Sequence, residues 1–226
     1  MKNFLFCLLA VVALASCGNG SKSSNQTSKS NAIDSIALKD SLFKQSVIKE
    51  EGNKAIANIK FFTSKAEFSK QKEVFLTPLI HTISLGSAGS YTDGYLLGEY
   101  VFDDMKGNFY NDSLFNVHII GQPINYEDYN NKMPKQCEAL ITILSNKYGS
   151  PNEINELPAW TTMSKNDVFF IARWNLGFKN LFVWVSCSGV EYSLDFCYYV
   201  PELADKKNKG ESDNSNNINK EASEIL

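Results

Sequence analysis

Histidine and cysteine carry much of the metal and nucleophilic chemistry of proteins, and this chain has two histidines and five cysteines. His81 and His118 each lack a second ligand at the His-x-x-x-His or Cys-x-x-Cys spacing that zinc sites use. Beyond the N-terminal leader, the thiols are Cys137, Cys187 and Cys197. We expect Cys137 and Cys197 on different sides of a sheet, so no metal site and no cofactor is predicted.

Other catalytic patterns are equally weak. The chain has no Gly-x-Ser-x-Gly nucleophile elbow. The loop from Gly86 to Gly94 is rich in Gly and Ser but lacks the Lys-Ser/Thr ending of a phosphate-binding loop. The acids that could form a glycosidase pair are Glu99, Asp103, Asp104, Glu127 and Asp128. Acids in loops are usually only solvated, and we therefore expect a protein that is not an enzyme.

The N-terminus reads as an export signal. Lys2 precedes an apolar run at residues 4–13, which is too short to span a bilayer as a helix, since that takes about 20 residues. The residues Leu14-Ala15-Ser16-Cys17 resemble the lipobox of bacterial lipoproteins. The resemblance implies cleavage after residue 16 and lipidation of Cys17, and Gly18 favours the outer membrane of a Gram-negative bacterium. The alternative is a buried apolar helix that happens to end in cysteine.

Composition divides the rest of the chain into three parts. Residues 17–31 are polar after Cys17 and predict a lipidated flexible tether. Residues 32–204 predict a single domain, because 43% of the chain is hydrophobic, as in folded proteins. Residues 205–226 are rich in Lys, Asn, Ser and Glu and predict a disordered tail. The net charge of −3 argues against nucleic acid as a partner.

The hydrophobic periodicity predicts an α+β fold with a single antiparallel sheet and helices packed on at least one face. Helices are expected at residues 33–50, from a Ser64-x-x-Glu67 capping box to residue 75, and at 134–148. Earlier strands are expected at 79–85, 95–102 and 113–120. Four consecutive C-terminal strands are expected at 159–163, 168–175, 181–187 and 192–200.

Alternation along these last strands predicts their register. Short turns would place Val185 opposite Leu194, Val183 opposite Phe196, and Leu181 opposite Tyr198. The preceding hairpin would place Trp174 opposite Leu181, Ala172 opposite Val183, and Phe170 opposite Val185. All of these side chains share one apolar face, which we expect the helix at 134–148 to cover. Cys187 and Cys197 then point to opposite faces, which disfavours a disulfide between them.

The opposite face is apolar enough to suggest a contact surface. We expect Phe182, Trp184 and Ile171 to form a partner-binding patch rimmed by Arg173 and Asp195. The alternative is that the helix at residues 33–50, or a loop, covers these side chains as a second core.

Two further segments resemble a group of proteins. Residues 59–68, and residues 140–151 with their Tyr148-Gly149-x-Pro151 ending, are similar to segments of small uncharacterised lipoproteins from gut and oral Gram-negative bacteria. Phe62 departs from the pattern, which has Gly there. The resemblance implies a β-lactamase-inhibitor-like layout of helices on an antiparallel sheet.

From the resemblance and the predicted patch we expect a membrane-anchored, non-catalytic binding or scaffold module for a protein partner. The alternatives are a glycan-binding or glycan-processing lipoprotein, and a structural lipoprotein without a specific ligand.

Overall fold

The computed structural model describes residues 27–84 and 90–209, and it is α+β with a nine-stranded sheet. The helices are α1 (Thr27–Glu51), α2 (Lys65–Leu76), α3 (Tyr129–Tyr148), the 3-10 turns η1 (Thr77–Leu79) and η3 (Trp160–Thr162), and a helical segment at 201–209. The strands of the sheet are β3 (Ile80–Ser84), β4 (Ser90–Leu97), β5 (Tyr100–Tyr110), β6 (Ser113–Gly121), β7 (Ile124–Asn125), β8 (Glu153–Ile154), β9 (Val168–Leu176), β10 (Lys179–Cys187) and β11 (Glu191–Tyr199). β1 (Lys54–Ile56) and β2 (Ile59–Lys60) form a separate two-stranded ribbon. The contacts below lie in the compact unit that begins at Leu38.

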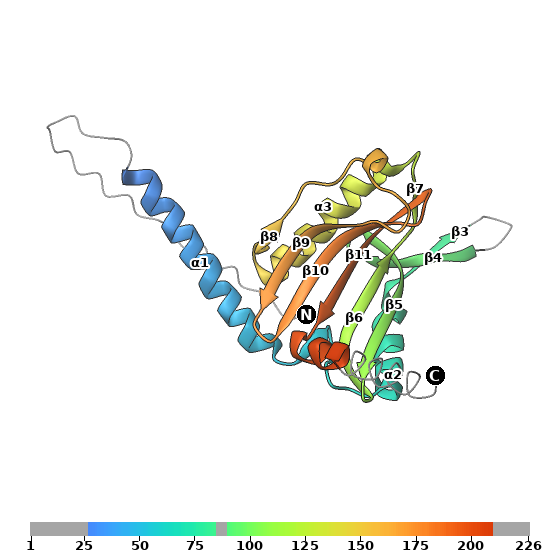
Figure 1. Cartoon of the computed structure of the whole chain (residues 1–226), viewed down its shortest axis with the longest axis horizontal. Coiled ribbons are helices and arrows are strands. Elements are labelled where there is room, and N and C mark those ends of the chain that lie inside the picture. The colour runs from blue at the N-terminus through green and yellow to red at the C-terminus, as the bar shows by residue number, and fades with distance from the viewer. Residues whose placement is uncertain (1–26, 85–89, 210–226) are drawn as a thin grey trace, which may run out of the picture. The chain divides into compact units, whose positions relative to one another are not determined.

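The sheet consists of two similar halves that meet in the middle. Its strand order is β3-β4-β5-β6-β11-β10-β9-β8, and the ninth strand, β7, pairs with β11 beside this path. Each half is thus an antiparallel meander preceded by one helix, α2 or α3 (Figure 1). The halves join along β6 and β11, where Ile119 pairs with Phe196. The β4–β5 and β9–β10 turns both have two residues and begin with glycine, Gly98 and Gly177, at φ of 62° and 80°. Glycine adopts this left-handed backbone without strain, which explains its place at both turns.

One face of the sheet carries the core. Trp174 is fully buried there, and its indole Nε1–H donates to the Gly149 carbonyl at the end of α3 over 2.7 Å. Phe68 of α2 lies over Gly107 of β5, where a β-carbon would come within 2.9 Å of the ring. The β1–β2 ribbon adds Ala55 and Ile59 to the same core. α2, α3 and the ribbon therefore all pack on this side.

Much of the predicted local structure is confirmed. The Ser64 hydroxyl accepts a hydrogen bond from the backbone N–H of Glu67 over 3.3 Å, as a cap of α2 should. The three residue pairs predicted between β10 and β11 all form. The fold class is α+β with four C-terminal strands, β8 to β11.

Several boundaries differ from the prediction. Residues 159–163 were expected as a strand but contain η3, and the first of the four strands is β8 at 153–154. Residues 95–102 were expected as one strand, but the Gly98 turn divides them between β4 and β5. α3 begins at Tyr129, so Pro134 lies inside the helix rather than in its first turn.

The predicted tether and tail also differ in part. Residues 27–31 belong to α1, and residues 205–209 continue a helix, so neither stretch is irregular. The rest of both, together with the predicted signal peptide at 1–16 and Cys17, lies outside the described residues.

Candidate functional site

A β-bulge in β9 changes the membership of the predicted patch. Arg173 pairs with Phe182 and Ala172 with Val183, but Trp184 then pairs with Phe170. Ile171 is the extra residue of the bulge, and it is 1% exposed. The prediction that Ile171 lies on the patch is therefore wrong, as is the pairing of Phe170 with Val185. Ile171 belongs to the core, and Phe170 takes its place beside Trp184.

Three aromatic side chains from β9, β10 and β11 lie side by side on this face, and we call them the aromatic row: Phe170, Phe182 and Tyr199. The Phe182 ring lies 5.7 Å from Phe170, edge to face, and 5.3 Å from Tyr199. The Arg173 guanidinium lies 5.9 Å from the Phe182 ring and forms a 2.9 Å ion pair with Glu153. All three rings are half-buried, so each still presents surface to solvent.

A polar cluster lies next to the aromatic row. Trp184 stacks at a tilt on His118, with 5.0 Å between ring centroids. The Nε2 of His118 lies 3.4 Å from Oδ2 of Asp195, yet it makes no hydrogen bond within the described part of the chain. Ser186 and Ser193 hydrogen-bond each other over 2.8 Å, and the Ser186 hydroxyl donates to Asp195 over 3.4 Å.

Asp195 has a different place from the one predicted. We expected it at the rim, but it is 5% exposed, and its Oδ1 accepts the backbone N–H of Gly121 over 2.9 Å. Its carboxylate therefore anchors the β6–β11 junction from beneath the polar cluster. Only Arg173 of the two predicted rim charges lies at the surface.

The helices α1, α2 and α3 lie away from this face. Side chains alternate along a strand, so Phe182 and Trp184 point away from the core residues between them and away from α3. The ring contacts of both come from sheet residues. The alternative that α1 covers the face disagrees with the contacts of α1. Ile48 lies against Gly177 in the β9–β10 turn, and Asp40 lies against Gly149 at the end of α3. We call this surface the open face.

The open face also contains a shallow hollow of about 170 Å³. It opens beside the Ser186–Ser193 pair, and Ile120 and Pro123 form its apolar side. An apolar wall next to paired hydroxyls suits a ligand with both kinds of surface.

The thiols are poorly suited to nucleophilic chemistry. Cys137, Cys187 and Cys197 are all free. Burial raises the pKa of Cys197 to about 12 and that of Cys137 to about 11, so both remain protonated at neutral pH. Across residues 27–84 and 90–209, no three His, Cys, Asp or Glu residues gather closely enough to hold a metal ion.

Sequence reasoning missed Phe170, Tyr199 and His118 as members of the open face. The alternation of β11 would have included Tyr199, and the pairing of β6 with β11 places His118 opposite Cys197.

The chain matches no protein-family model, and no curated protein and no solved structure is significantly similar to it. Within the described residues, no helix has the length and apolar character needed to cross a membrane.

Proposed function

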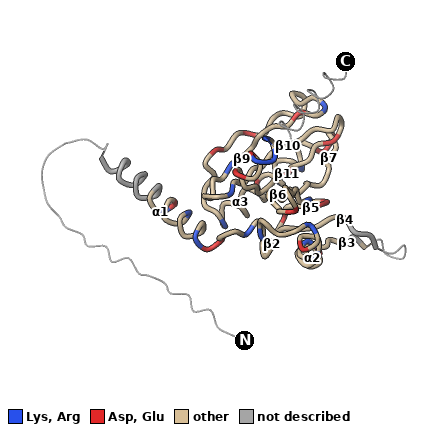
Figure 2. Tube along the Cα trace, turned by 60° about the horizontal axis from the view of Figure 1, so that its bottom comes forward, with Lys and Arg blue, Asp and Glu red and all other residues tan. Residues whose placement is uncertain are grey.

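We propose that this protein is a membrane-anchored binding module that holds a protein partner against its open face. The observation that carries the proposal is the aromatic row, three half-buried rings with a guanidinium beside them, on the side of the sheet away from α2 and α3. Aromatic and arginine side chains dominate the binding energy of protein interfaces, and exposed apolar patches often mark partner sites. Basic and acidic residues are mixed along the described chain (Figure 2), which fits a protein partner better than a nucleic acid.

The anchor is part of the same proposal. The Leu14-Ala15-Ser16-Cys17 sequence after a short apolar run supports export and lipidation of Cys17, and Gly18 supports the outer membrane. In bacterial cells, Cys17→Ser should release the protein from the membrane fraction and abolish incorporation of labelled fatty acid. Cys7→Ser, which lies within the proposed signal peptide, should change neither. Retention of labelled lipid by Cys17→Ser would refute the anchor.

The binding proposal is tested by site-specific photo-crosslinking in the native cell envelope. A photoreactive residue in place of Val168, which is 65% exposed and pairs with Ser186 on the open face, should crosslink to one defined protein. The same residue in place of Phe62, which is 50% exposed and lies between β2 and α2, outside the aromatic row, is the matched control. Phe182→Ala with Trp184→Ala should abolish the crosslink from position 168 while circular dichroism stays unchanged. A folded double variant that keeps the crosslink would refute the proposal.

A glycan is the second candidate ligand, favoured by the polar cluster. Sugar rings stack on aromatic faces and bind hydroxyls and carboxylates, and Trp184 lies close to the Ser186–Ser193 pair. A glycan should change the tryptophan fluorescence of the native protein and leave that of Trp184→Phe unchanged. The other tryptophans, Trp160 and Trp174, are in both proteins, so the comparison isolates the open face.

A further inference from the structure

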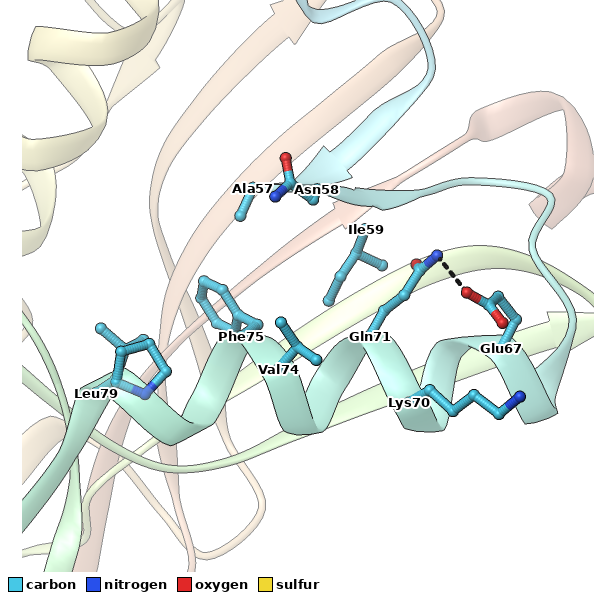
Figure 3. A pocket seen from close by; sticks show the side chains of 10 residues that line it. Ala57, Asn58, Ile59, Glu67, Lys70, Gln71, Val74, Phe75 and Leu79 are labelled. Atoms are coloured by element: carbon cyan, nitrogen blue, oxygen red, sulfur yellow. Dashed lines mark hydrogen bonds between the residues drawn. The ribbon is translucent and has the colours of Figure 1, made fainter.

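A second concave surface lies on the helix side of the sheet, between α2 and the turn that joins β1 to β2. It is a slot of about 440 Å³, within the size range of small-molecule sites (Figure 3). Ile59 lies at its base, and the side chains of Gln71 and Phe75 rise toward it from the helix. The opposite wall is held in a strained conformation, because Ala57 has a φ of 49° that non-glycine residues rarely adopt.

The slot changes from polar to apolar along its length. Gln71, Phe75 and Leu79 follow at intervals of four and form one stripe, and Lys70, Val74 and Pro78 form a second. Both stripes begin with a polar residue and continue with apolar ones. At about 1.5 Å per residue, the helical segment from Glu67 to Leu79 is roughly 18 Å long. The apolar end is open to solvent, since Val74 is 74% exposed.

At the other end, the Gln71 amide oxygen and the Lys70 ammonium have no partner among the described residues. The Gln71 amide Nε2 donates to Glu67 over 3.0 Å, but its Oε1 is shielded from solvent and accepts no hydrogen bond within the described part of the chain. A shielded acceptor without a donor is unfavourable, so a ligand that supplies an N–H or O–H would stabilise the site. The exposed Lys70 ammonium forms no ion pair with a described residue. The polar end therefore offers one acceptor and the Lys70 charge, beside a Glu67 carboxylate that already accepts the Gln71 amide N–H.

We propose that this slot binds a single-chain amphiphile whose head group carries a negative charge and a hydrogen-bond donor. The charge would face Lys70, the donor would face Gln71 Oε1, and the aliphatic chain would lie along Val74, Phe75 and Leu79. The whole ligand, head group included, would be about 18 Å long at most. A globular partner would meet a broad surface, whereas this slot is narrow and graded in polarity along one axis. The open face is on the other side of the sheet, so the two proposals stand or fall separately.

N-lauroylglycine is the matching probe, since it has a twelve-carbon chain, an amide N–H and a carboxylate. Isothermal titration calorimetry of the purified full chain, below the micellar concentration, should show one binding site. N-lauroylsarcosine has an N-methyl group in place of the N–H, so it should bind at least fivefold more weakly. Gln71→Leu should remove that difference between the two probes.

Two pairs of variants locate the site. Val74→Glu places a charge in the apolar end and should weaken binding at least tenfold, while Ser69→Glu, on the opposite side of α2, should not change it. Lys70→Glu should weaken binding several-fold, and Lys65→Glu, in the first turn of α2, should not. Absence of binding by the native chain would overturn the proposal, as would full binding by a folded Val74→Glu variant. If the native chain binds N-lauroylsarcosine as tightly as N-lauroylglycine, the role of Gln71 is overturned.

Discussion

Oε2 of Glu51 and Nζ of Lys179 lie 3.2 Å apart, an ion pair that ties the end of α1 to the start of β10. Lys179 is 1% exposed, and its ammonium also donates to the Lys54 carbonyl over 2.6 Å. The rings of Tyr148 and Tyr198 lie 5.6 and 5.5 Å from it. The buried charge therefore has a counterion, a carbonyl and two aromatic faces, which together compensate for its loss of hydration.

We expect removal of the counterion to be costly. Glu51→Ala would leave Lys179 buried and charged without its carboxylate, which should lower the free energy of unfolding by about 3 kcal/mol. Lys179→Met removes the charge itself and should cost less, about 1 kcal/mol, because apolar replacements of buried ions are often tolerated. Urea denaturation followed by circular dichroism measures both. Glu50→Ala is the matched control, since Glu50 is an exposed neighbour, and equal losses for Glu50→Ala and Glu51→Ala would contradict the role of the ion pair.

The same pair should make stability depend on pH under acid conditions. Burial alone would raise the pKa of Glu51, but the nearby Lys147 and Lys179 outweigh it and hold the pKa below its ordinary value of 4.5. Because the folded state binds the Glu51 proton less readily than the unfolded state, the contribution is complete above pH 4.5 and is lost as the pH falls through the folded-state pKa. The stability difference between native protein and Glu51→Gln should therefore be constant near pH 7 and shrink below pH 4.5. A difference that does not change down to pH 3 would exclude Glu51 as its source.

The sequence was sufficient to predict the register at the C-terminal end of the sheet. Leu181, Val183 and Val185 alternate with more polar or aromatic neighbours, and a slip of one residue would have moved all three to the other face. A short turn at 188–190 then fixed their partners in β11.

The bulge in β9 could not be predicted in the same way. Phe169, Phe170, Ile171 and Ala172 are four consecutive apolar residues, so an extra residue among them leaves no break in the pattern. The burial of Asp195 could not be predicted for a different reason. It depends on the neighbouring strand β6, where the Gly121 N–H donates to the Asp195 carboxylate. The α2 slot depends on the β1–β2 turn, which local periodicity does not place against a helix.

The bulge predicts that alanine substitutions at the neighbouring residues Ile171 and Phe170 differ clearly in their effect on stability. Ile171 is packed in the core, so Ile171→Ala should lower the free energy of unfolding by about 3 kcal/mol, as for other buried isoleucines. Phe170 is half-buried on the open face, so Phe170→Ala should cost less than half as much despite removing a larger side chain. Chemical denaturation of the two variants gives the comparison. The reverse order would mean that β9 lacks the bulge and that the regular alternation holds.

We expect a single added methyl group to lower stability most at the junction of the two halves. A β-carbon on Gly121 would fall on the backbone of Leu194 in the facing strand, and a strand backbone cannot rotate aside. The Gly121 N–H also donates to Asp195, and the Tyr100 hydroxyl donates to the Leu194 carbonyl over 2.6 Å, which holds the strands together from both sides. Gly121→Ala should therefore separate β6 from β11 and cost about 3 kcal/mol.

Gly107→Ala is the matched control for this prediction. A β-carbon at Gly107 would come within 2.9 Å of the Phe68 ring and 3.0 Å of the Leu114 side chain, and side chains at those distances can shift. Gly107→Ala should therefore cost clearly less than Gly121→Ala in thermal or urea unfolding. Hydrogen exchange should also increase at the Ile119 and Phe196 amides in Gly121→Ala and not in Gly107→Ala, because only the first change affects the β6–β11 pairing. Equal losses with unchanged exchange would show that the close approach at Gly121 does not hold the two halves together.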